Sequence, residues 1–358
     1  MADERTIVVF GAYGHTGRFV VEELRARGWR SRLSGRDREK LAALATKYPD
    51  AAIAPASVED PASLDTALHG AAAVINCAGP FADTSAPIID AALRVRMPYV
   101  DVMAEVEALV SVFERYDEPA RAAGVVIAPA MAFYGALGDL LATAAMRDWP
   151  RADAIDVAYA LDRWQPTRGT RATIETSKRR RDGRRLVYRD RRLELRTDAA
   201  PVVEWTFPAP FGVQPAVAEY TTTAAVAMSR HLATNELQSY MTLAPLKGLS
   251  DPDAAPPVAV DDSGRSAQMF AVEVVVRKDT IERRAVARGR DIYAVSAPIA
   301  VEAATRLVRG TSGRGGVVTA GEIFPAEEFL RALSPAITIA PCHNPVMTPR
   351  VHVMNDHR

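Results

Sequence analysis

The stretch Thr6-Ile7-Val8-Val9-Phe10-Gly11-Ala12-Tyr13-Gly14-His15-Thr16-Gly17 decides the fold of this chain. It begins with an apolar, β-rich run, which leads directly into a turn that contains three glycines. Beyond the turn, Phe19, Val20 and Leu24 recur with helical spacing. A strand, a tight turn and a helix in this order begin a βαβ unit.

Strand-like and helix-like segments then alternate as far as residue 128. The expected strands are 32–34, 51–58, 72–77, 99–102 and 125–128, and the expected helices are 38–48, 61–68, 86–95 and part of 106–122. Asp60 before Pro61 is a favourable N-cap with a proline in the first turn. Repeated βα units of this length predict a doubly wound, parallel sheet.

The pattern changes after about residue 130. Segments rich in Val, Tyr, Thr and Arg predict longer strands of a second, mixed or antiparallel sheet, at 154–161, 170–181, 184–195 and 269–278. Asp182-Gly183, between two of these segments, predicts a hairpin turn. Residues 249–268 predict a long polar loop, and 297–308 and 326–333 return to helical spacing.

The predicted fold class is α/β: a Rossmann domain with a doubly wound parallel sheet, and an inserted second α+β domain with a mixed or antiparallel sheet. A chain of 358 residues is long enough for two such cores. The expected division is a dinucleotide-binding domain at 1–130, a substrate or dimerisation domain at 131–290, helices that pack back on the first domain at 291–340, and a tail at 341–358.

Composition excludes several classes of protein. The formal net charge is zero, so no global charge attracts nucleic acid or an anionic membrane. Cys77 and Cys342 are the only cysteines, which excludes a disulfide framework and favours a reducing compartment, interpreted as the cytoplasm. The N-terminus runs directly into a strand and no apolar run reaches the ~20 residues of a membrane helix, so neither a secretion signal nor membrane association is expected.

The glycines of the first turn have the spacing G-x-x-G-x-x-G. Gly11 permits the tight turn, Gly14 lets backbone N–H groups approach a pyrophosphate, and Gly17 lets the helix pack closely on the strand. The N-terminus of the following helix offers a positive dipole to the anion. A glycine triplet alone is weak evidence of a site, but its place between a strand and a helix predicts a dinucleotide-binding turn.

The end of the second strand favours the phosphorylated cofactor, NADP(H). An NAD site places a carboxylate there for the ribose hydroxyls, whereas this strand ends Leu33-Ser34-Gly35-Arg36. The Arg36 guanidinium can pair with a 2′-phosphate and stack on the adenine, and Ser34 can donate a hydrogen bond. Asp37 suits the N-cap of the next helix. The alternative is that Arg36 is an ordinary exposed loop arginine.

A third segment at the carboxyl end of the sheet is Asn76-Cys77-Ala78-Gly79-Pro80-Phe81, where small residues leave room for a cofactor. Cys77 is interpreted as a small buried side chain rather than a reactive thiol. The predicted cofactor-binding residues are Gly11, Tyr13, Gly14, His15, Thr16, Gly17, Ser34, Arg36, Asn76, Cys77, Ala78, Gly79 and Pro80.

Together these segments resemble the saccharopine-dehydrogenase-like NADP-binding oxidoreductase family, which includes trans-acting enoyl reductases. The resemblance is carried by residues 11–18, 34–37, 76–81 and Pro-Tyr-Val-Asp at 98–101, and it extends to Gly-Gly-Val-Val-Thr-Ala-Gly-Glu at 315–322. It implies a Rossmann domain, an inserted α/β substrate domain and NADP(H) in the cleft between them. Residues 102–105 and 132–139 depart from the family's usual Thr-Gly-Glu and Gly-Phe-Asp, so the relatives' substrate is not transferred.

Tyr134 is the first candidate for catalysis, because it follows the sixth strand in a glycine-containing segment where its hydroxyl could face the nicotinamide. The alternative is a tyrosine half-buried at a domain junction. Asp101 and Glu105 follow the fifth strand and could hold or protonate a substrate, or only cap a helix. His231 is a plausible acid that titrates near neutrality, although a lone histidine is more often structural.

Further residues of the second domain are candidates for binding a substrate carboxylate, namely Arg168, Arg171, Arg230 and Tyr240. The basic segment 178–196 suggests docking of an acidic acyl-carrier protein, whereas its alternating charges argue against nucleic-acid binding. No metal-binding motif is present, so no metal is expected. Homodimerisation through the second sheet is a further expectation.

The leading hypothesis is an NADPH-dependent reductase of a C=N or C=O bond in a small, carboxylated metabolite. An enoyl reductase acting on a carrier-bound acyl chain is the enzymatic alternative, and the basic segment is its support. A hypothesis of another class is a non-catalytic NADP(H)-binding sensor or scaffold.

Overall fold

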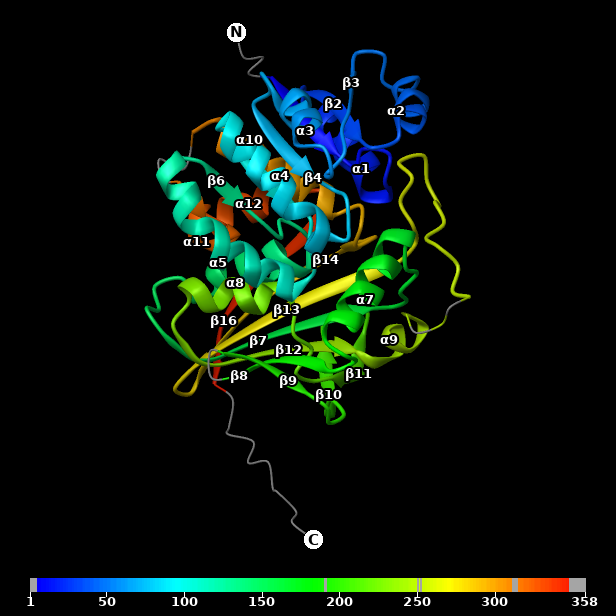
Figure 1. Cartoon of the computed structure of the whole chain (residues 1–358). Coiled ribbons are helices and arrows are strands. Elements are labelled where there is room, and N and C mark those ends of the chain that lie inside the picture. The colour runs from blue at the N-terminus through cyan, green and yellow to red at the C-terminus, as the bar shows by residue number, and fades with distance from the viewer. Residues whose placement is uncertain (1–4, 190–191, 250, 252, 311–314, 348–358) are drawn as a thin grey trace.

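The computed structural model describes residues 5–189, 192–249, 251, 253–310 and 315–347. They form two seven-stranded sheets and a short two-stranded hairpin, with helices on both faces of the first sheet and on one face of the second (Figure 1). This confirms the predicted fold class of a parallel Rossmann-like sheet with a second, mixed sheet.

The first sheet has the strand order β15-β6-β5-β4-β1-β2-β3, and all of its pairs are parallel. Its strands are β1 (Thr6–Phe10), β2 (Arg30–Gly35), β3 (Ala52–Pro55), β4 (Ala73–Asn76), β5 (Tyr99–Asp101), β6 (Val126–Ala128) and β15 (Gly316–Val317). The order reverses between β1 and β4, so the first glycine-rich turn lies at the switch point where such sheets bind ligands.

The helices that follow these strands agree with the sequence pattern. They are α1 (His15–Ala26), α2 (Arg38–Ala45), α3 (Pro61–Leu68), α4 (Phe81–Val95) and α5 (Val106–Ala123). The Asp37 side chain accepts a hydrogen bond from the Lys40 amide, and Asp60 accepts hydrogen bonds from the amides of Ala62 and Ser63. Both N-caps that were expected from the sequence are therefore confirmed.

The second sheet has the strand order β10-β11-β12-β7-β13-β14-β16. Its strands are β7 (Ala152–Leu161), β10 (Val202–Phe207), β11 (Gly212–Val217), β12 (Thr234–Thr242), β13 (Met269–Lys278), β14 (Ile281–Arg290) and β16 (Ile337–Met347). β12 pairs with β7 in parallel and the other pairs are antiparallel, so the sheet is mixed. The separate hairpin consists of β8 (Arg185–Arg189) and β9 (Arg192–Arg196).

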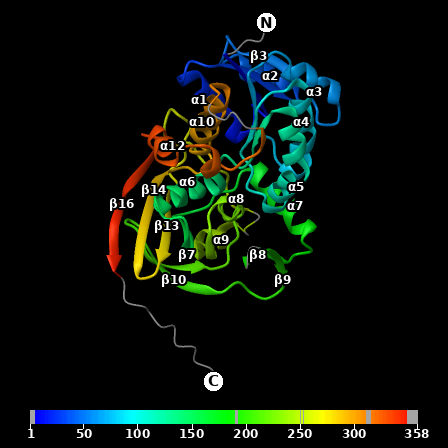
Figure 2. The same ribbon diagram turned by 90° about the vertical axis from the view of Figure 1, so that its left-hand side faces the viewer.

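The layer between the two sheets begins just after β6. The chain forms a π-helical turn, η1 (Phe133–Leu137), which continues into α6 (Gly138–Met146). In the side view, α6 lies against β13 and β14 (Figure 2). The remaining helices of this part of the chain are α7 (Arg168–Arg180), α8 (Thr223–His231) and α9 (Leu243–Leu249).

The chain then returns to the first domain. α10 (Ser296–Val308) packs against α1, and β15 pairs with β6 to extend the first sheet. Two short helices complete the return, α11 (Ala320–Ile323) and α12 (Ala326–Ala332), and both pack against α6. None of the described helices is long and apolar enough to cross a membrane.

The expected strand at 170–181 is wrong, because these residues belong to α7. Thr167 accepts a hydrogen bond from the Thr170 amide and caps the helix, and Lys178, Arg179 and Arg180 lie in its last turn, where positive charge is favourable. Asp182-Gly183 accordingly ends this helix instead of joining two strands. The Gly183 amide donates to the Lys178 carbonyl 3.0 Å away, as in a helix C-cap.

The tail expected from residue 341 is also partly wrong, because β16 continues to Met347 along the edge of the second sheet. The sequence 348–358 lies outside the described residues. The long loop expected at 249–268 is confirmed for its described part, in which the only pairing is an isolated bridge between Ala259 and Ser266.

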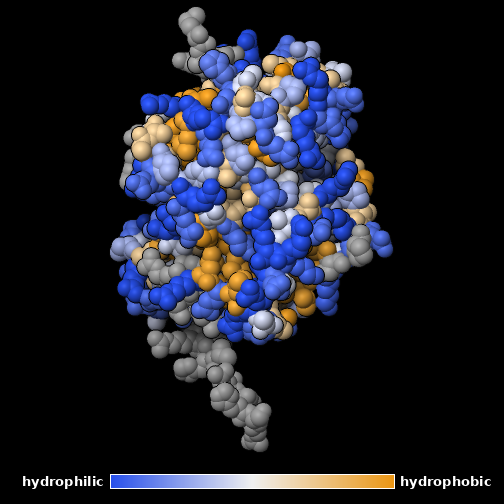
Figure 3. Space-filling view, in the orientation of Figure 1, coloured by the Kyte–Doolittle hydropathy of each residue, from blue (hydrophilic) through white to orange (hydrophobic). Residues whose placement is uncertain are grey.

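Hydrophobic side chains gather in the lower half of the face shown in Figure 3, where the second domain lies. Val202 and Val213, on the outer hairpin β10–β11, are 54% and 60% exposed. Such a surface is compatible with association, but pairing of two copies through this sheet stays a prediction.

Candidate functional site

Two glycines of the first turn lie so close to neighbouring atoms that a side chain would not fit there. Gly11 has φ of 80°, and a Cβ there would lie 2.9 Å from the Cβ of Ala78. A Cβ on Gly17 would lie 2.3 Å from the Gly11 carbonyl oxygen. Any larger residue at either position would therefore displace the backbone of the turn.

The N-terminus of α1 is open to a ligand. Gly14 is the N-cap residue, and no side chain caps the amides of the first turn. These N–H groups and the positive end of the helix dipole suit an anion, as in other dinucleotide-binding turns. The turn thus has the features that hold a pyrophosphate.

The end of β2 lies beside this turn. The Ser34 carbonyl accepts hydrogen bonds from the amides of Gly11 and Ala12, at 2.8 and 3.2 Å, and its buried hydroxyl has no partner among the described residues. Gly35 has φ of 151°, and a Cβ there would lie 2.9 Å from the Tyr13 ring. Arg36 is exposed and forms no hydrogen bond or ion pair within the described part of the chain. A guanidinium free to pair with a 2′-phosphate fits NADP(H).

Asn76 shapes the segment after β4. Its side-chain carbonyl accepts from the Ala78 amide at 3.0 Å, and its amide group donates to the hydroxyls of Tyr99 and Thr84. The residue is fully buried, so it holds the loop 77–80 in place from below. Burial raises the pKa of the neighbouring Cys77 thiol, which supports the reading of Cys77 as a small, unreactive side chain.

A pocket opens between the two domains, next to these segments, and encloses about 150 Å³. The first domain contributes Thr16, Cys77 and Gly79 to its lining, and the chain that leaves this domain contributes Tyr134. α7 contributes Thr170 and Thr173. The turn at α1 and the loop after β4 thus open directly onto a cavity that the second domain closes.

Tyr134 is placed at this pocket by η1. Its hydroxyl is buried and has no hydrogen-bond partner among the described residues. Its ring lies 5.6 Å from that of Trp164 and 4.8 Å from that of Phe133, measured between centroids. Burial raises the pKa of Tyr134 well above its usual value, so the hydroxyl stays protonated and is a hydrogen-bond donor that lacks an acceptor.

The wall opposite the first domain is held by the Tyr293 hydroxyl. It receives a hydrogen bond from the Trp164 indole at 3.1 Å and lies 2.9 Å from the Thr170 hydroxyl. The Tyr293 ring also packs edge-on against His15, with centroids 5.3 Å apart. The His15 ring therefore lies between the rings of Phe19 and Tyr293, and burial lowers its pKa, so it stays neutral near pH 7.

The structure does not bring Asp101 to the pocket. Its carboxylate is completely buried and accepts hydrogen bonds from the Ala130 and Met103 amides and from the Tyr99 hydroxyl, at 2.8, 3.1 and 2.8 Å. Burial outweighs these hydrogen bonds and raises the pKa of Asp101 to about 7. The carboxyl group joins β5 to the chain that leads into η1.

Glu105 has a similar structural place at the edge of the pocket. Its carboxylate accepts from the amides of Phe81 and Ala82, at 2.7 and 3.0 Å, and so caps the first turn of α4. The Thr173 hydroxyl of α7 donates to it at 3.2 Å. Burial raises the pKa of Glu105, opposed by these hydrogen bonds.

His231 does not line this pocket. It lies at the end of α8, where its Nε2 is 2.7 Å from the carboxylate of the fully buried Asp139. Asp139 also accepts from the Gly321 amide at 2.7 Å. Burial lowers the pKa of His231, but hydrogen bonding and the charge of Asp139 raise it overall. The pair ties α8 and α11 to α6.

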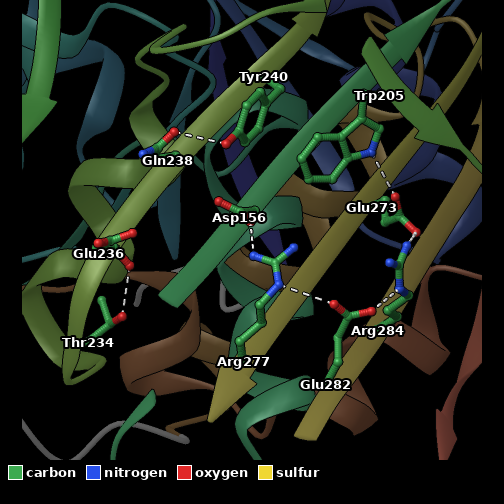
Figure 4. Close-up of polar contacts among 10 residues, drawn as sticks. All are labelled: Asp156, Trp205, Thr234, Glu236, Gln238, Tyr240, Glu273, Arg277, Glu282 and Arg284. Atoms are coloured by element: carbon green, nitrogen blue, oxygen red, sulfur yellow. Dashed lines mark hydrogen bonds and ion pairs between the residues drawn. The ribbon is translucent and has the colours of Figure 1, made fainter. Parts of the chain in front are cut away.

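Three of the four expected carboxylate-binding side chains are engaged elsewhere. Arg171 donates to the backbone carbonyls of Asp251 and Ala254, and the Arg230 guanidinium lies 3.9 Å from the centre of the Phe113 ring. Tyr240 donates to Gln238 at 2.8 Å on the outer face of the second sheet (Figure 4). Arg168 is exposed at the start of α7 and does not line the pocket.

Figure 4 shows that Tyr240 shares its face with a chain of ion pairs that runs across the second sheet. Arg277 bridges Asp156 and Glu282, and Arg284 bridges Glu282 and Glu273. Because successive side chains of a strand point to opposite faces, Asp156 lies on the side away from Tyr159, whose ring contacts Tyr134. This network is therefore separate from the pocket.

The basic segment 178–196 is partly neutralised. Arg180 pairs with Asp83, Arg181 with Glu107, and Arg185 with both Asp198 and Glu219. These pairs attach the end of α7 and the hairpin to neighbouring elements. Docking of an acyl-carrier protein on this segment stays a prediction.

Sequence reasoning missed several side chains of the pocket, namely Trp164, Thr170, Thr173 and Tyr293. The threonines recur three residues apart, which is helical spacing, and Thr167 before them is a favourable N-cap. That signal could have revealed α7. Trp164 and Tyr293 come together only in the folded chain, 129 residues apart in sequence. Within the described residues no cluster of side chains could hold a metal ion.

Comparisons with known proteins agree with this site. Residues 7–128 match the family described as the saccharopine dehydrogenase NADP binding domain. The chain is 32% identical over 152 residues to a "saccharopine dehydrogenase-like oxidoreductase" of Bos taurus, and 33% identical to the protein of the same name in Homo sapiens. Each of these matches covers 37% of this chain and 35% of the relative, so only about a third of each relative's length is matched.

Among solved structures, the apo saccharopine dehydrogenase (L-Glu forming) of Saccharomyces cerevisiae superimposes with a TM-score of 0.66. The superposition covers 94% of this chain and 99% of that chain at 12% sequence identity, which shows that both domains share its fold. The sequence matches and the glycine-rich turn assign the first domain. Residues 7–128 thus match the saccharopine dehydrogenase NADP binding domain, and the rest of the chain lies outside that match.

Proposed function

We propose that this protein is an NADPH-dependent oxidoreductase that reduces a C=O or C=N bond of a small molecule held between its two domains. The observation that carries the proposal is the Tyr134 hydroxyl, which is buried, protonated and without an acceptor in a pocket that opens beside the dinucleotide turn. An unpaired buried donor costs about 1–3 kcal/mol, and a substrate oxygen or nitrogen would satisfy it.

The residues that would hold the cofactor follow from the geometry. The uncapped amides at the start of α1 face the pyrophosphate position, and Arg36 and Ser34 offer a guanidinium and a hydroxyl to the 2′-phosphate. Thr16, Cys77 and Gly79 line the pocket from the cofactor side. When bound, NADPH would supply a hydride.

Tyr134 would orient the acceptor and stabilise its developing negative charge. A hydrogen bond from a preorganised donor in a water-poor pocket is stronger than the same bond in water. Because the pKa of Tyr134 is raised, the hydroxyl is a weak acid in the empty pocket, so donation of a hydrogen bond comes before any proton transfer. His231 and Asp101 lie outside the pocket lining, so Tyr134 is the one of the three expected catalytic residues that lines the pocket.

The test is single-turnover transfer from 4-deuterated NADPH, supplied as each of its two stereoisomers, to a panel of ketones, imines and enoyl thioesters. Mass spectrometry of the products locates the deuterium. Label in a ketone or imine product supports the proposal, whereas label only in an enoyl product favours the alternative of an enoyl reductase. Tight NADPH binding without transfer to any acceptor favours a non-catalytic sensor or scaffold.

We also propose a cytoplasmic location and the division into a cofactor domain and an inserted substrate domain. The presence of only two cysteines in the sequence supports the cytoplasmic location. The two separate sheets support the division into two domains. A homodimer is compatible with the exposed valines of β10–β11. Light scattering of the purified protein would establish its oligomeric state.

A further inference from the structure

The pocket between the domains contains no formal charge. None of the residues that line it within the described part of the chain is an Asp, Glu, Lys, Arg or His. Its walls are aromatic rings and hydroxyl groups, among them Phe81, Phe133, Tyr134, Trp164 and Tyr293. Pockets that orient a charged metabolite place an opposite charge within reach of it, and this pocket has none in its lining.

Most charged groups that adjoin the pocket are already occupied, and Arg168, which lies between the lining residues Thr167 and Gly169, is exposed and does not line the pocket. Glu105 accepts two backbone amides and the Thr173 hydroxyl. Asp291 accepts from the amides of Ser266, Tyr293 and Ala294. Arg171 donates to two backbone carbonyls. Recruiting any of these groups to a substrate would break hydrogen bonds that hold the walls of the pocket.

From these contacts we propose that the substrate is uncharged where it enters the pocket: a neutral carbonyl compound with an aromatic or other apolar body. The rings of the lining would pack on that body, and the Tyr134 hydroxyl would mark the position of its polar atom. The proposal rests on the proposed function and replaces the carboxylated metabolite expected from the sequence. A pocket for amino acids would need charged partners for the ammonium and carboxylate groups, and this lining has none.

One feature of the pocket opposes this assignment. The N-terminus of α7 borders it at Thr167 and Gly169, and helix N-termini favour anions. The Thr167 side chain, however, already accepts from the Thr170 amide, and the Thr167 amide lies 3.4 Å from the Tyr293 hydroxyl. The described lining therefore offers an anion backbone amides and hydroxyl groups, but no positively charged side chain.

The test compares two ligands of the same shape and different charge. Phenylacetamide and phenylacetate are titrated by calorimetry into the full-length protein saturated with NADP⁺, so that the cofactor site is filled. We expect the neutral amide to bind at least tenfold more tightly, because the carboxylate would lose its hydration without a partner. Equal binding, tighter binding of phenylacetate, or no measurable binding of phenylacetamide would overturn the proposal.

A matched pair of variants places a charge in the same pocket. Ala104 lines the pocket and is exposed, so a longer side chain is tolerated there. Ala104→Arg is expected to raise the affinity for phenylacetate at least fivefold relative to Ala104→Gln, which has a similar length and no charge. An equal affinity in the two variants would show that phenylacetate does not enter this pocket, and the assignment of the selectivity to it would fail.

The binding measurements do not depend on turnover. Reduction of phenylacetaldehyde by NADPH is measured separately with the same protein. Selective binding of phenylacetamide without any reduction would leave the neutral pocket standing while contradicting the proposed reductase. Reduction of carboxylated aldehydes in preference to phenylacetaldehyde would support the proposed reductase while contradicting the neutral pocket.

Discussion

At the scale of single residues, the site depends on side chains whose polar atoms lack a partner within the protein. The buried hydroxyls of Tyr134 and Ser34 and the exposed guanidinium of Arg36 have this property in the described structure. By contrast, Asp101 and Asn76 are satisfied on every side. A missing partner indicates a ligand-binding role only for residues that also border the pocket or the cofactor turn, because buried hydroxyls elsewhere, such as those of Thr223 and Ser239, lack a partner as well.

Tyr134→Phe removes the unpaired donor and leaves the ring in place. We expect kcat to fall by about 100-fold or more, with little change in the affinity for NADPH, because the hydroxyl acts on the acceptor. Tyr159→Phe is the control: its hydroxyl is also buried, but it does not line the pocket. Steady-state kinetics with an identified acceptor check this, and equal losses in both variants would remove Tyr134 from the mechanism.

Arg36→Ala tests the choice of cofactor. We expect NADPH to bind at least tenfold more weakly and NADH to bind almost unchanged, because only NADPH carries the 2′-phosphate. Arg38→Ala, a nearby exposed arginine at the start of α2, is the matched control. Fluorescence titration with both cofactors measures the effect. An equal loss for NADPH and NADH would mean that Arg36 does not bind the 2′-phosphate.

At the scale of elements, α7 differs most from what the sequence suggested. Its Thr and Ile residues and its alternating charges are typical of a strand, but the cap at Thr167 and the basic last turn favour a helix. The threonines are used at helical spacing: Thr170 and Thr173 border the pocket, and Thr176 is buried. Local propensity was overridden by the end groups and by tertiary contacts.

Thr167→Ala removes the cap of α7. We expect the helix to lose about 1 kcal/mol of local stability, because the Thr170 amide loses its acceptor. Hydrogen exchange of the α7 amides should become faster, while the amides of the first sheet exchange as before. Thr167→Ser retains the hydroxyl and should behave like the parent protein. Unchanged exchange in Thr167→Ala would show that tertiary contacts alone hold the helix.

The first sheet and its cofactor turn could be predicted because their signals are local. The strand 6–10, the three glycines and the N-caps at Asp37 and Asp60 are all read from neighbouring residues. The pocket could not be predicted in the same way, since Trp164 and Tyr293 meet from distant parts of the chain. The structural roles of Asp101 and His231 could not be predicted either, because their hydrogen-bond partners, Ala130 and Asp139, are distant in the sequence.

At the scale of the whole molecule, stability is coupled to the buried carboxyl of Asp101, which joins the sheet to the interdomain layer. Its pKa in the folded protein is raised from 3.8 to about 7, so the folded state binds a proton more tightly than the unfolded chain does. The contribution of this group to stability therefore falls as pH rises from about 4 to about 7, by at most about 1.4 kcal/mol per pH unit.

Asp101→Asn removes this titration and nearly preserves the shape of the side chain. We expect the free energy of unfolding of the parent protein, relative to that of the variant, to decrease between about pH 5 and pH 7. Urea unfolding at both pH values measures it. A difference that stays constant or increases with pH would show that Asp101 is ionised in the folded protein across this range. His231 titrates in both proteins, so its effect cancels, whereas Glu105, whose charge raises the pKa of Asp101, is part of the measured difference.

The return of the chain to the first sheet restricts how this architecture can be rearranged in evolution. The cofactor half is closed by β15 and covered by α10, which the chain supplies only after it has built the second sheet. A gene fragment ending near residue 130 would leave β6 as an open edge, a ready template for aggregation. The interchangeable cassette is therefore the central segment, and a new specificity is more readily acquired by replacing the middle of the gene than by fusing its beginning to another partner.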